Sequence, residues 1–227
     1  NRNPSNSPVP NQGYPGGNSI SPGSPNENYG GGAGGGAGSV GGNAADPSTG
    51  GTGGSGKASV ITRGPANPVT RAGGGGGGIQ DPGGTIGSGG PGGGGRGGKS
   101  TVDTDRAYSG DLSTGSGGGG GGTEGRNVPA GNGGSGIVVV RYQIGELSGT
   151  AKATGGAISF YGGKTIHTFT STGPFQTPGT FSETCEYVVV GGGGGAFTGG
   201  GGAGGYRTGT TPIGSSVNYT ITVGAGG

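Results

Sequence analysis

The strongest enzyme-like pattern in the chain is a glycine-rich run that matches a phosphate-binding loop. Residues 93–100 read GGGRGGKS, which satisfies the pattern G-x-x-x-x-G-K-S. Phosphate binding by this pattern needs a buried strand before the loop and a helix after it, so that backbone amides and the helix N-terminus point at the phosphate. Residues 81–91 predict no strand, and residues 101–108 lead only to Gly110. The match therefore follows from composition, and we expect neither a cofactor nor an enzyme.

Two other charged patterns predict no ligand site. Arg96-Gly97-Gly98 is typical of RNA-binding segments, but nucleic-acid binding relies on clustered cations. Here 12 Lys and Arg residues are scattered along the chain among 10 Asp and Glu residues, so no nucleic-acid partner is expected. Asp103, Asp105 and Asp111 are close in sequence, but their spacing fits no standard calcium loop. We interpret this segment as a solvated acidic turn without a metal.

The single histidine and the single cysteine both fall in segments that predict β-strands. His167 has no second His and no paired Cys, so it can form neither a zinc site nor a proton relay. It is expected to be a half-buried strand residue that faces the same way as Phe169. Cys185 cannot form an internal disulfide, and it shares one strand face with Tyr187 and Val189. Two interpretations stay open for Cys185: a small buried thiol, or a disulfide cross-link between neighbouring subunits.

The composition excludes an ordinary oily core. Glycine supplies 73 of the 227 residues and proline 15, while only 24% are apolar and 10% charged. Globular domains are close to half apolar. Collagen is excluded, because Lys99 to Ser109 contains no glycine and collagen needs glycine at every third position. The longest apolar runs, 137–140 and 188–190, are far shorter than the roughly 18 residues of a membrane span, so no membrane insertion is expected.

The chain changes character near Gly136. Residues 1–136 predict loops and glycine runs, and helix is excluded throughout because each interior glycine costs a helix about 1 kcal/mol. From Ile137 onward β-branched and aromatic runs predict strands. Buried strands are expected at Ile137–Gln143 and Cys185–Val190. Two short strands, Ile158–Tyr161 and Lys164–Thr170, are expected on either side of a Gly162-Gly163 hairpin turn. An edge strand or loop is expected at Phe175–Phe181, and a strand with alternating apolar and polar residues at Asn218–Val223.

Glycine runs join the predicted strands directly, which indicates that the runs are ordered. Val190 leads into Gly191, and Gly136 leads into Ile137. A glycine run has no side chain to bury, so it is stable only where neighbouring backbones satisfy its N–H and C=O groups. The extended three-fold conformation called polyglycine II allows such lateral bonding. We expect an all-β and irregular fold with essentially no helix, in which a small β-sheet or sandwich packs with polyglycine-II-like runs; the alternative is that the runs are flexible linkers.

The order of the elements suggests a permuted repeat. Residues 1–143 form a glycine-rich lattice with loops and the closing strand of one unit, residues 144–156 form a linker, and residues 157–227 open the next unit. Joining 157–227 to 1–143 of another copy completes one module, which suits a tandem array or a homopolymer. The expected partners are therefore other copies of the chain. The alternative is that terminal strands complete a neighbour's sheet.

Several segments resemble the glycine-rich domain family of marine phage and bacterial surface proteins. They read GGAISFYGGKTIHTFTSTGPF, EYVVVGGGGG, GGGGAGGYRTGT, YTITVGAGG and GNGGSGIVVVRYQ, so the resemblance is specific over residues 133–227 and mainly compositional over 1–132. A more distant similarity is to phage tail-tip adhesins whose glycine runs form polyglycine-II helices. The resemblance implies an extracellular fibre or filament module on a virion or cell surface, and it transfers no catalytic residue.

A lattice of glycine runs would leave recognition to the loops between them. The function expected is a structural fibre module with adhesive loops; the alternative is a terminal adhesin that recognises a cell-surface glycan or outer-membrane protein. Aromatic and arginine residues in or beside glycine-bearing loops are the candidate receptor contacts, because these residue types often dominate interface energies. An equally open interpretation is that they cover the lattice ends. They are Tyr14, Tyr29, Arg63, Arg71, Tyr108, Phe197, Tyr206 and Arg207.

Overall fold

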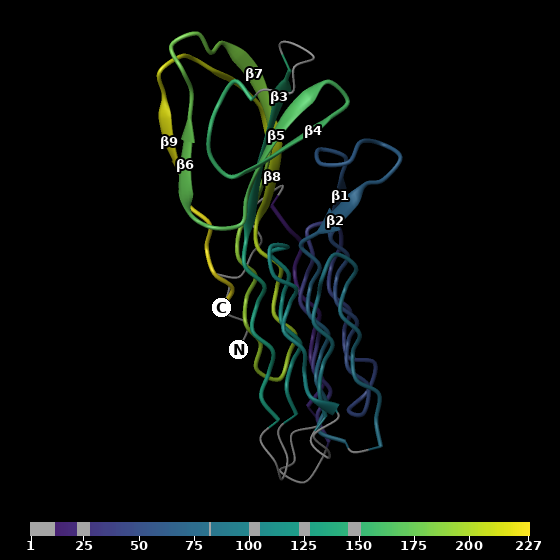
Figure 1. The fold of residues 1–227 in the computed structure, drawn as a ribbon. Coiled ribbons are helices and arrows are strands. Elements are labelled where there is room, and N and C mark those ends of the chain that lie inside the picture. Colours follow the sequence, from purple (N-terminus) through teal and green to yellow (C-terminus); the bar gives the residue numbers. More distant parts are fainter. Residues whose placement is uncertain (1–11, 22–27, 82, 100–104, 123–127, 145–150) are drawn as a thin grey trace.

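The computed structural model describes residues 12–21, 28–81, 83–99, 105–122, 128–144 and 151–227. The molecule is elongated, with a β-sheet head at one end and a bundle of extended segments running away from it (Figure 1). The described residues contain essentially no helix, which confirms the all-β expectation. The strands are β1 Lys57–Ser59, β2 Val69–Arg71, β3 Ile137–Gln143, β4 Ala157–Tyr161, β5 Lys164–Phe169, β6 Gly173–Gln176, β7 Glu183–Val190, β8 Tyr206–Ile213 and β9 Asn218–Ile221.

The head is built on a five-stranded antiparallel sheet in the order β4-β5-β3-β7-β8. Strand β3 lies at its centre, and Val139 is opposite Thr168 of β5 and Val188 of β7. Its first four residues are all buried. Because alternate side chains of a strand face opposite sides, a strand covered on both sides can be apolar at every position. The unbroken run IVVV therefore follows from the central place of β3.

One face of the sheet is covered by the two-stranded ribbon β6–β9, so the head is a small sandwich (Figure 1). Val138, Val140 and Tyr142 point to this side and share a core cluster with Phe175 of the ribbon. Phe175 lies edge-on to Phe169, with ring centroids 6.4 Å apart. Such edge-to-face aromatic packing supplies much of the apolar area that the composition otherwise lacks.

The other face of the sheet joins the head to the glycine segments. Ile137 and Val139 point to this side, where they cluster with Ile61, Ala37 and Ala72 from the N-terminal half of the chain. Ala37 and Ala72 lie at the ends of glycine runs. The sheet and the glycine bundle thus share one buried interface.

Residues 72–79 show how the glycine segments are held together. Their successive N–H groups donate to three neighbouring segments in turn, so that the pattern repeats at every third residue. The donors Gly73 to Gly78 reach, in order, the carbonyls of Gly92, Gly54, Gly201, Gly95, Gly51 and Thr198, at 2.8–3.4 Å. A three-residue period is the period of the polyglycine II helix.

The carbonyl groups of the same segment repeat in the same way and reach three further segments. Gly73 to Gly78 accept, in order, from the N–H groups of Gly117, Gly90, Gly34, Gly120, Gly87 and Gly31. The central segment therefore has six bonded neighbours, as in a hexagonal lattice. This arrangement confirms the polyglycine-II-like expectation, and the runs are ordered elements of the fold.

Only glycine fits at these lattice positions. A Cβ atom added to Gly75 would overlap the carbonyl oxygen of Gly118, and one added to Gly77 would overlap that of Gly31. Both separations are shorter than the 3.0 Å below which real Cβ contacts are essentially never found. Each ordered glycine gives up more backbone entropy than other residues do, and the lateral hydrogen bonds offset that loss.

The structure confirms most of the expected strands and adds three. The hairpin between β4 and β5 turns at Gly162 and Gly163, whose φ angles of 57° and 72° require residues that tolerate the left-handed region. The short strands β1 and β2 and the edge strand β8 were not predicted. Strand β8 contains Gly209 and Pro212, which argue against a strand, but Gly209 lies against the Tyr187 ring and Pro212 is tolerated at a sheet edge.

The expected linker 144–156 is partly integrated into the head. Residues 145–150 lie outside the described residues, but Ala153 is 2% exposed and its N–H donates to the Tyr142 hydroxyl at 3.0 Å. Strand β3 pairs with β5 and β7 of the same chain, and glycine segments from both halves share one lattice. That the chain is a permuted repeat stays a prediction.

Candidate interaction surfaces

The segment that matches a phosphate-binding loop is part of the lattice. The N–H groups of Gly95, Gly97 and Gly98 donate to the carbonyls of Gly117, Gly87 and Gly120 at 2.8–3.0 Å. The Lys99 ammonium lies 3.5 Å from the Asp105 carboxylate. Ser100 lies outside the described residues. Because these amides are engaged by neighbouring carbonyls, they do not form the cradle that phosphate binding requires.

His167 is a fully buried structural residue. It faces the same side of the sheet as Phe169, since both rings lie edge-on to Phe175. Half-burial was expected, but its exposure is 0%, because the ribbon and the segment around Gly155 cover it. The Nδ1 atom lies 2.7 Å from the Gly155 carbonyl, which can only accept. Nδ1 therefore carries the proton, and Nε2 accepts from the Tyr142 hydroxyl at 3.0 Å.

Burial shifts the pKa values of both His167 and Tyr142. Burial lowers the pKa of His167, and the hydrogen bond to the Gly155 carbonyl opposes that shift only in part. Burial also raises the pKa of Tyr142. Both shifts favour the neutral side chains, as expected for groups removed from water. The pair fixes the position of residues 153–155 against the sheet.

Charged side chains fasten the head to the loop after β1. Arg141 donates to the carbonyls of Val60 and Ile61 at 3.2 Å, and it also pairs with Glu186, which binds Lys164 as well. Burial acts to raise the pKa of Glu186, but the hydrogen bonds from Arg141 and Lys164 outweigh it and lower the pKa. The members of this cluster are far apart in the chain, so their spacing in the sequence does not predict that they meet.

The described residues contain no group of three or more His, Cys, Asp or Glu side chains that could hold a metal ion. Asp103, one of the three clustered aspartates, lies outside that part of the chain. No helix long and apolar enough to cross a membrane is found in the described ranges.

Cys185 is predicted to be unreactive in the folded protein. Its side chain is fully buried, and burial raises its pKa to about 11. Because the thiolate is the reactive form, iodoacetamide at pH 8 should leave the folded protein unmodified and label it once urea unfolds the chain. Mass spectrometry measures the labelling. Rapid modification of the folded protein would contradict this, and the inter-subunit disulfide stays an untested prediction.

Six of the eight candidate receptor contacts are at least partly accessible. Phe197 is 81% exposed, Tyr108 56% and Tyr14 51%. Arg63 and Arg207 are exposed, and Tyr29 is half-buried. The expectation of exposure is wrong for the other two, Arg71 and Tyr206, which are 8% and 3% exposed.

Both buried residues lie where the head meets the lattice. Tyr206 packs with Val190 and Ala72 in the core cluster, and the Lys57 ammonium lies 5.7 Å from the centre of its ring. Arg71 ends β2 beside the glycine runs, and burial lowers its pKa. Sequence position beside a glycine run predicts a loop end, but it does not tell which loop ends face the head.

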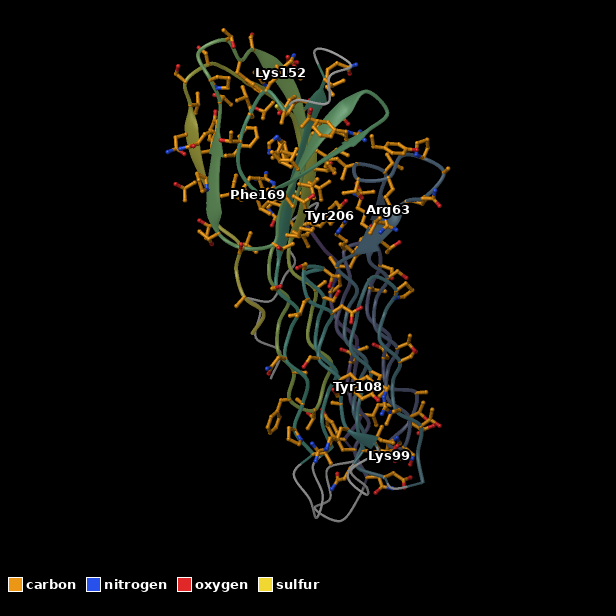
Figure 2. All side chains as sticks on the ribbon, viewed as in Figure 1. Arg63, Lys99, Tyr108, Lys152, Phe169 and Tyr206 are labelled. Atoms are coloured by element: carbon orange, nitrogen blue, oxygen red, sulfur yellow. The ribbon has the colours of Figure 1, made fainter. Side chains whose placement is uncertain are left out.

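The accessible candidates do not form one site. Arg63 lies at the head end of the lattice, whereas Tyr108 and Lys99 lie toward the far end (Figure 2). Tyr29 is also at the far end, because its hydroxyl accepts a hydrogen bond from Thr198 at 3.3 Å, next to Phe197. The Tyr108 ring stacks on the Arg96 guanidinium, 4.2 Å from its centre. Aromatic side chains therefore gather around the far end of the bundle.

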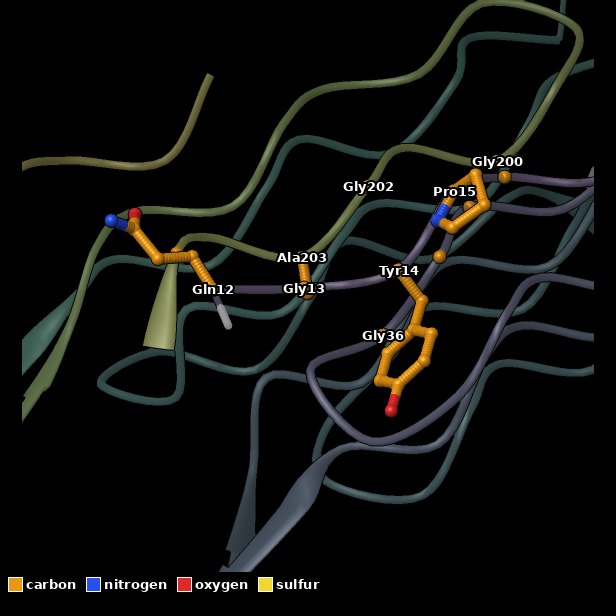
Figure 3. A pocket seen from close by; sticks show the side chains of 12 residues that line it. Gln12, Gly13, Tyr14, Pro15, Gly36, Gly200, Gly202 and Ala203 are labelled. Atoms are coloured by element: carbon orange, nitrogen blue, oxygen red, sulfur yellow. The ribbon is translucent and has the colours of Figure 1, made fainter. Parts of the chain in front are cut away.

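A groove of about 440 Å³ runs along the side of the lattice (Figure 3). Eight of its twelve lining residues are glycine, and the lining comes from three segments, 12–16, 34–36 and 200–205. Sequence reasoning missed this groove, because glycine positions carry no signal for which faces of a run are covered. A second, apolar hollow of about 240 Å³ lies between the ribbon β6–β9 and the sheet, where Cys185 and Phe175 are among its lining residues.

Comparison with known proteins places the chain in a family. No curated protein and no solved structure matches it. The sequence profile of the glycine-rich domain family matches residues 1–143, which is more than half of the chain. This range holds most of the lattice, whereas the motifs that suggested the family lie mainly after it. The chain belongs to the glycine-rich domain family.

Proposed function

We propose that this chain is a structural module of an extracellular fibre or filament on a virion, such as a phage tail fibre, or on a bacterial surface, with adhesive loops at the lattice end. The observation that carries the proposal is the central segment 72–79, which is hydrogen-bonded to six neighbours. Bonds along all six directions make a rod that resists bending, which suits a fibre. The same packing leaves few side chains inside the bundle that could take part in chemistry.

The shape of the molecule supports the proposal. The rod separates the head from the far end, toward which Tyr108 and Lys99 lie (Figure 2). Loops held at the end of a rigid scaffold are common places for recognition. A fibre module of this kind would repeat or polymerise through other copies of itself.

Localisation tests the structural role. Antibodies raised against the folded chain, detected with gold particles in electron microscopy, should label filaments on intact cells or the tails of purified virions. Labelling confined to the cell interior would contradict the proposal. A control serum absorbed with the folded protein should give no label.

A second candidate function is a terminal adhesin, and the exposed aromatics at the far end favour it. Phe197 is 81% exposed beside Tyr29 and Thr198. A large apolar side chain so exposed on a rigid tip can anchor a glycan ring or enter a protein pocket, since aromatic residues often dominate binding.

A matched pair of variants tests the adhesin function. We predict that Phe197→Ser lowers binding of the labelled protein to host cells at least about tenfold, as expected for loss of a dominant contact. Leu112→Ser is the control, because Leu112 is similarly exposed, at 79%, but lies near the head. The N–H of the next residue, Ser113, donates to the hydroxyl of Ser135, which lies two residues before β3. Equal binding by both variants would exclude Phe197 as an anchor.

A further inference from the structure

The segment 31–37 has five lattice neighbours among the described residues, where the central segment has six. Its N–H groups at 31, 34 and 37 reach the central segment, and those at 33 and 36 reach residues 39–42. Its carbonyls accept from the segments 51–54, 14–17 and 200–203, again with a period of three. The only direction left is that of the N–H groups of Gly32 and Gly35.

The groups that face this direction are incompletely bonded. The Gly32 N–H donates to the Ser19 hydroxyl at 2.9 Å, so a side chain closes one end of the position. The Gly35 N–H has no hydrogen-bond partner within the described ranges, although Gly35 is buried. An unpaired buried N–H destabilises the fold, so this position favours a carbonyl group from outside.

The groove lies at this sixth position. In the lattice, residues 12–18 and 198–204 are both neighbours of segment 31–37, and the groove runs between them with Gly34, Gly35 and Gly36 as its floor (Figure 3). The floor and one wall exclude larger residues, since a Cβ added to Gly16 would lie 2.9 Å from the Ala33 carbonyl oxygen. Gly202 on the other wall is exposed, and a Cβ added there meets no atom within 4 Å.

We propose that this groove binds an extended glycine run of a second copy of this chain, which completes the hexagonal ring around segment 31–37. The groove offers the unpaired Gly35 N–H, three residues along from the Gly32 N–H that Ser19 satisfies. Because the floor is glycine backbone, an occupant at lattice spacing is expected to be glycine where it faces the floor. The chain itself has such runs at its surface. One is 224–227, which is mostly exposed and is hydrogen-bonded to two neighbouring segments, at Gly133 and Gly136 and at Gly193.

This inference rests on the proposed fibre function and deepens it, because it identifies a surface through which copies associate. The two copies would meet through backbone hydrogen bonds with the same three-residue period as the bonds inside the molecule. Exchange of the Gly35 N–H should therefore depend on protein concentration.

Blocking the groove tests the proposal. Gly202→Leu places a side chain in open space, so the variant should fold while its groove is filled. Gly214→Leu is the matched control, since a Cβ at Gly214 also meets no atom within 4 Å but the residue lies in the head, after β8. In sedimentation velocity runs of the full chain over a concentration series, the wild type and Gly214→Leu should associate. Gly202→Leu should have a dissociation constant at least about tenfold higher.

Hydrogen exchange of the peptide that contains Gly35 separates the possible occupants. Protection that rises with concentration in the wild type and not in Gly202→Leu supports the proposal. Protection that is independent of concentration and lost when residues 1–11 are deleted would show that the chain fills its own groove, which overturns it. Equal association by the wild type and both variants would also overturn the proposed groove contact, but it would not contradict the fibre function. Immunogold labelling that is confined to the cell interior would contradict the fibre function itself.

Discussion

Gly75→Ala should lower the free energy of unfolding by about 3 kcal/mol or more, although it adds only one methyl group. Gly75 donates to Gly201 and accepts from Gly34, and its Cα faces the Gly118 carbonyl oxygen. The new Cβ would overlap that oxygen, which belongs to a backbone held by its own hydrogen bonds. For a domain of this size the change corresponds to a Tm about 6–12 °C lower, which circular dichroism or calorimetry measures.

Gly214→Ala is the control for this prediction. A Cβ at Gly214 meets no atom within 4 Å, and its φ is not in the left-handed region. Replacing glycine with alanine at a compatible position reduces the entropy of the unfolded chain, so this variant should be as stable as the wild type or up to about 1 kcal/mol more stable. If Gly75→Ala and Gly214→Ala melted at the same temperature, the lattice could not be the structural core.

The contrast between these two glycines shows what composition conveys and what it does not. The excess of glycine, together with the direct joins between runs and strands, predicted the lattice, because only close backbone packing makes ordered glycine runs stable. The composition could not predict that replacing Gly75 costs more stability than replacing Gly214, since both residues are glycine. Their difference arises from the lateral position of each run, which depends on contacts between distant segments.

The head shows the same division. The run at 137–140 correctly predicted a buried strand, because unbroken β-branched residues fit a strand that is covered on both faces. Strand β8 was missed, because Gly209 and Pro212 are breakers by type but are tolerated where they lie. Among the candidate contacts, Phe197 is exposed as predicted and Arg71 is buried. The position of a residue beside a glycine run predicts that it lies near an end of the lattice. Only the fold shows that the head covers one of these ends.

The stability of this protein should also fall as the pH falls through the imidazole range. His167 is the only histidine of the chain, and it is buried with Nδ1–H donating to the Gly155 carbonyl and Nε2 accepting from Tyr142. The Tyr142 oxygen already accepts from the Ala153 N–H. A proton added to Nε2 would face a hydroxyl group that must then redirect its own hydrogen inside a buried site, which disfavours the imidazolium.

The sign follows from the lowered pKa of His167, which burial causes. The unfolded chain binds its proton near pH 6.5, and the folded protein binds it only at lower pH. Between these two values the unfolded state holds more protons, so the free energy of unfolding decreases as the pH falls, by up to about 1.4 kcal/mol per pH unit. Above about pH 7.5 this group causes no change. Glu186, whose pKa is lowered, acts in a separate window below about pH 4.3, where its stabilising contribution is lost.

Urea unfolding measured from pH 8 to pH 5 checks this prediction, and the single histidine makes the control unusually clean. A His167→Gln variant that still folds carries no imidazole, so its stability should be flat across the range in which the wild type declines. His167→Phe provides a second variant, in case Gln leaves a polar group unpaired in the buried site. A wild-type curve that is flat between pH 7 and pH 5 would mean that the imidazole titrates alike in both states. The neutral hydrogen-bond network around His167 would then be wrong.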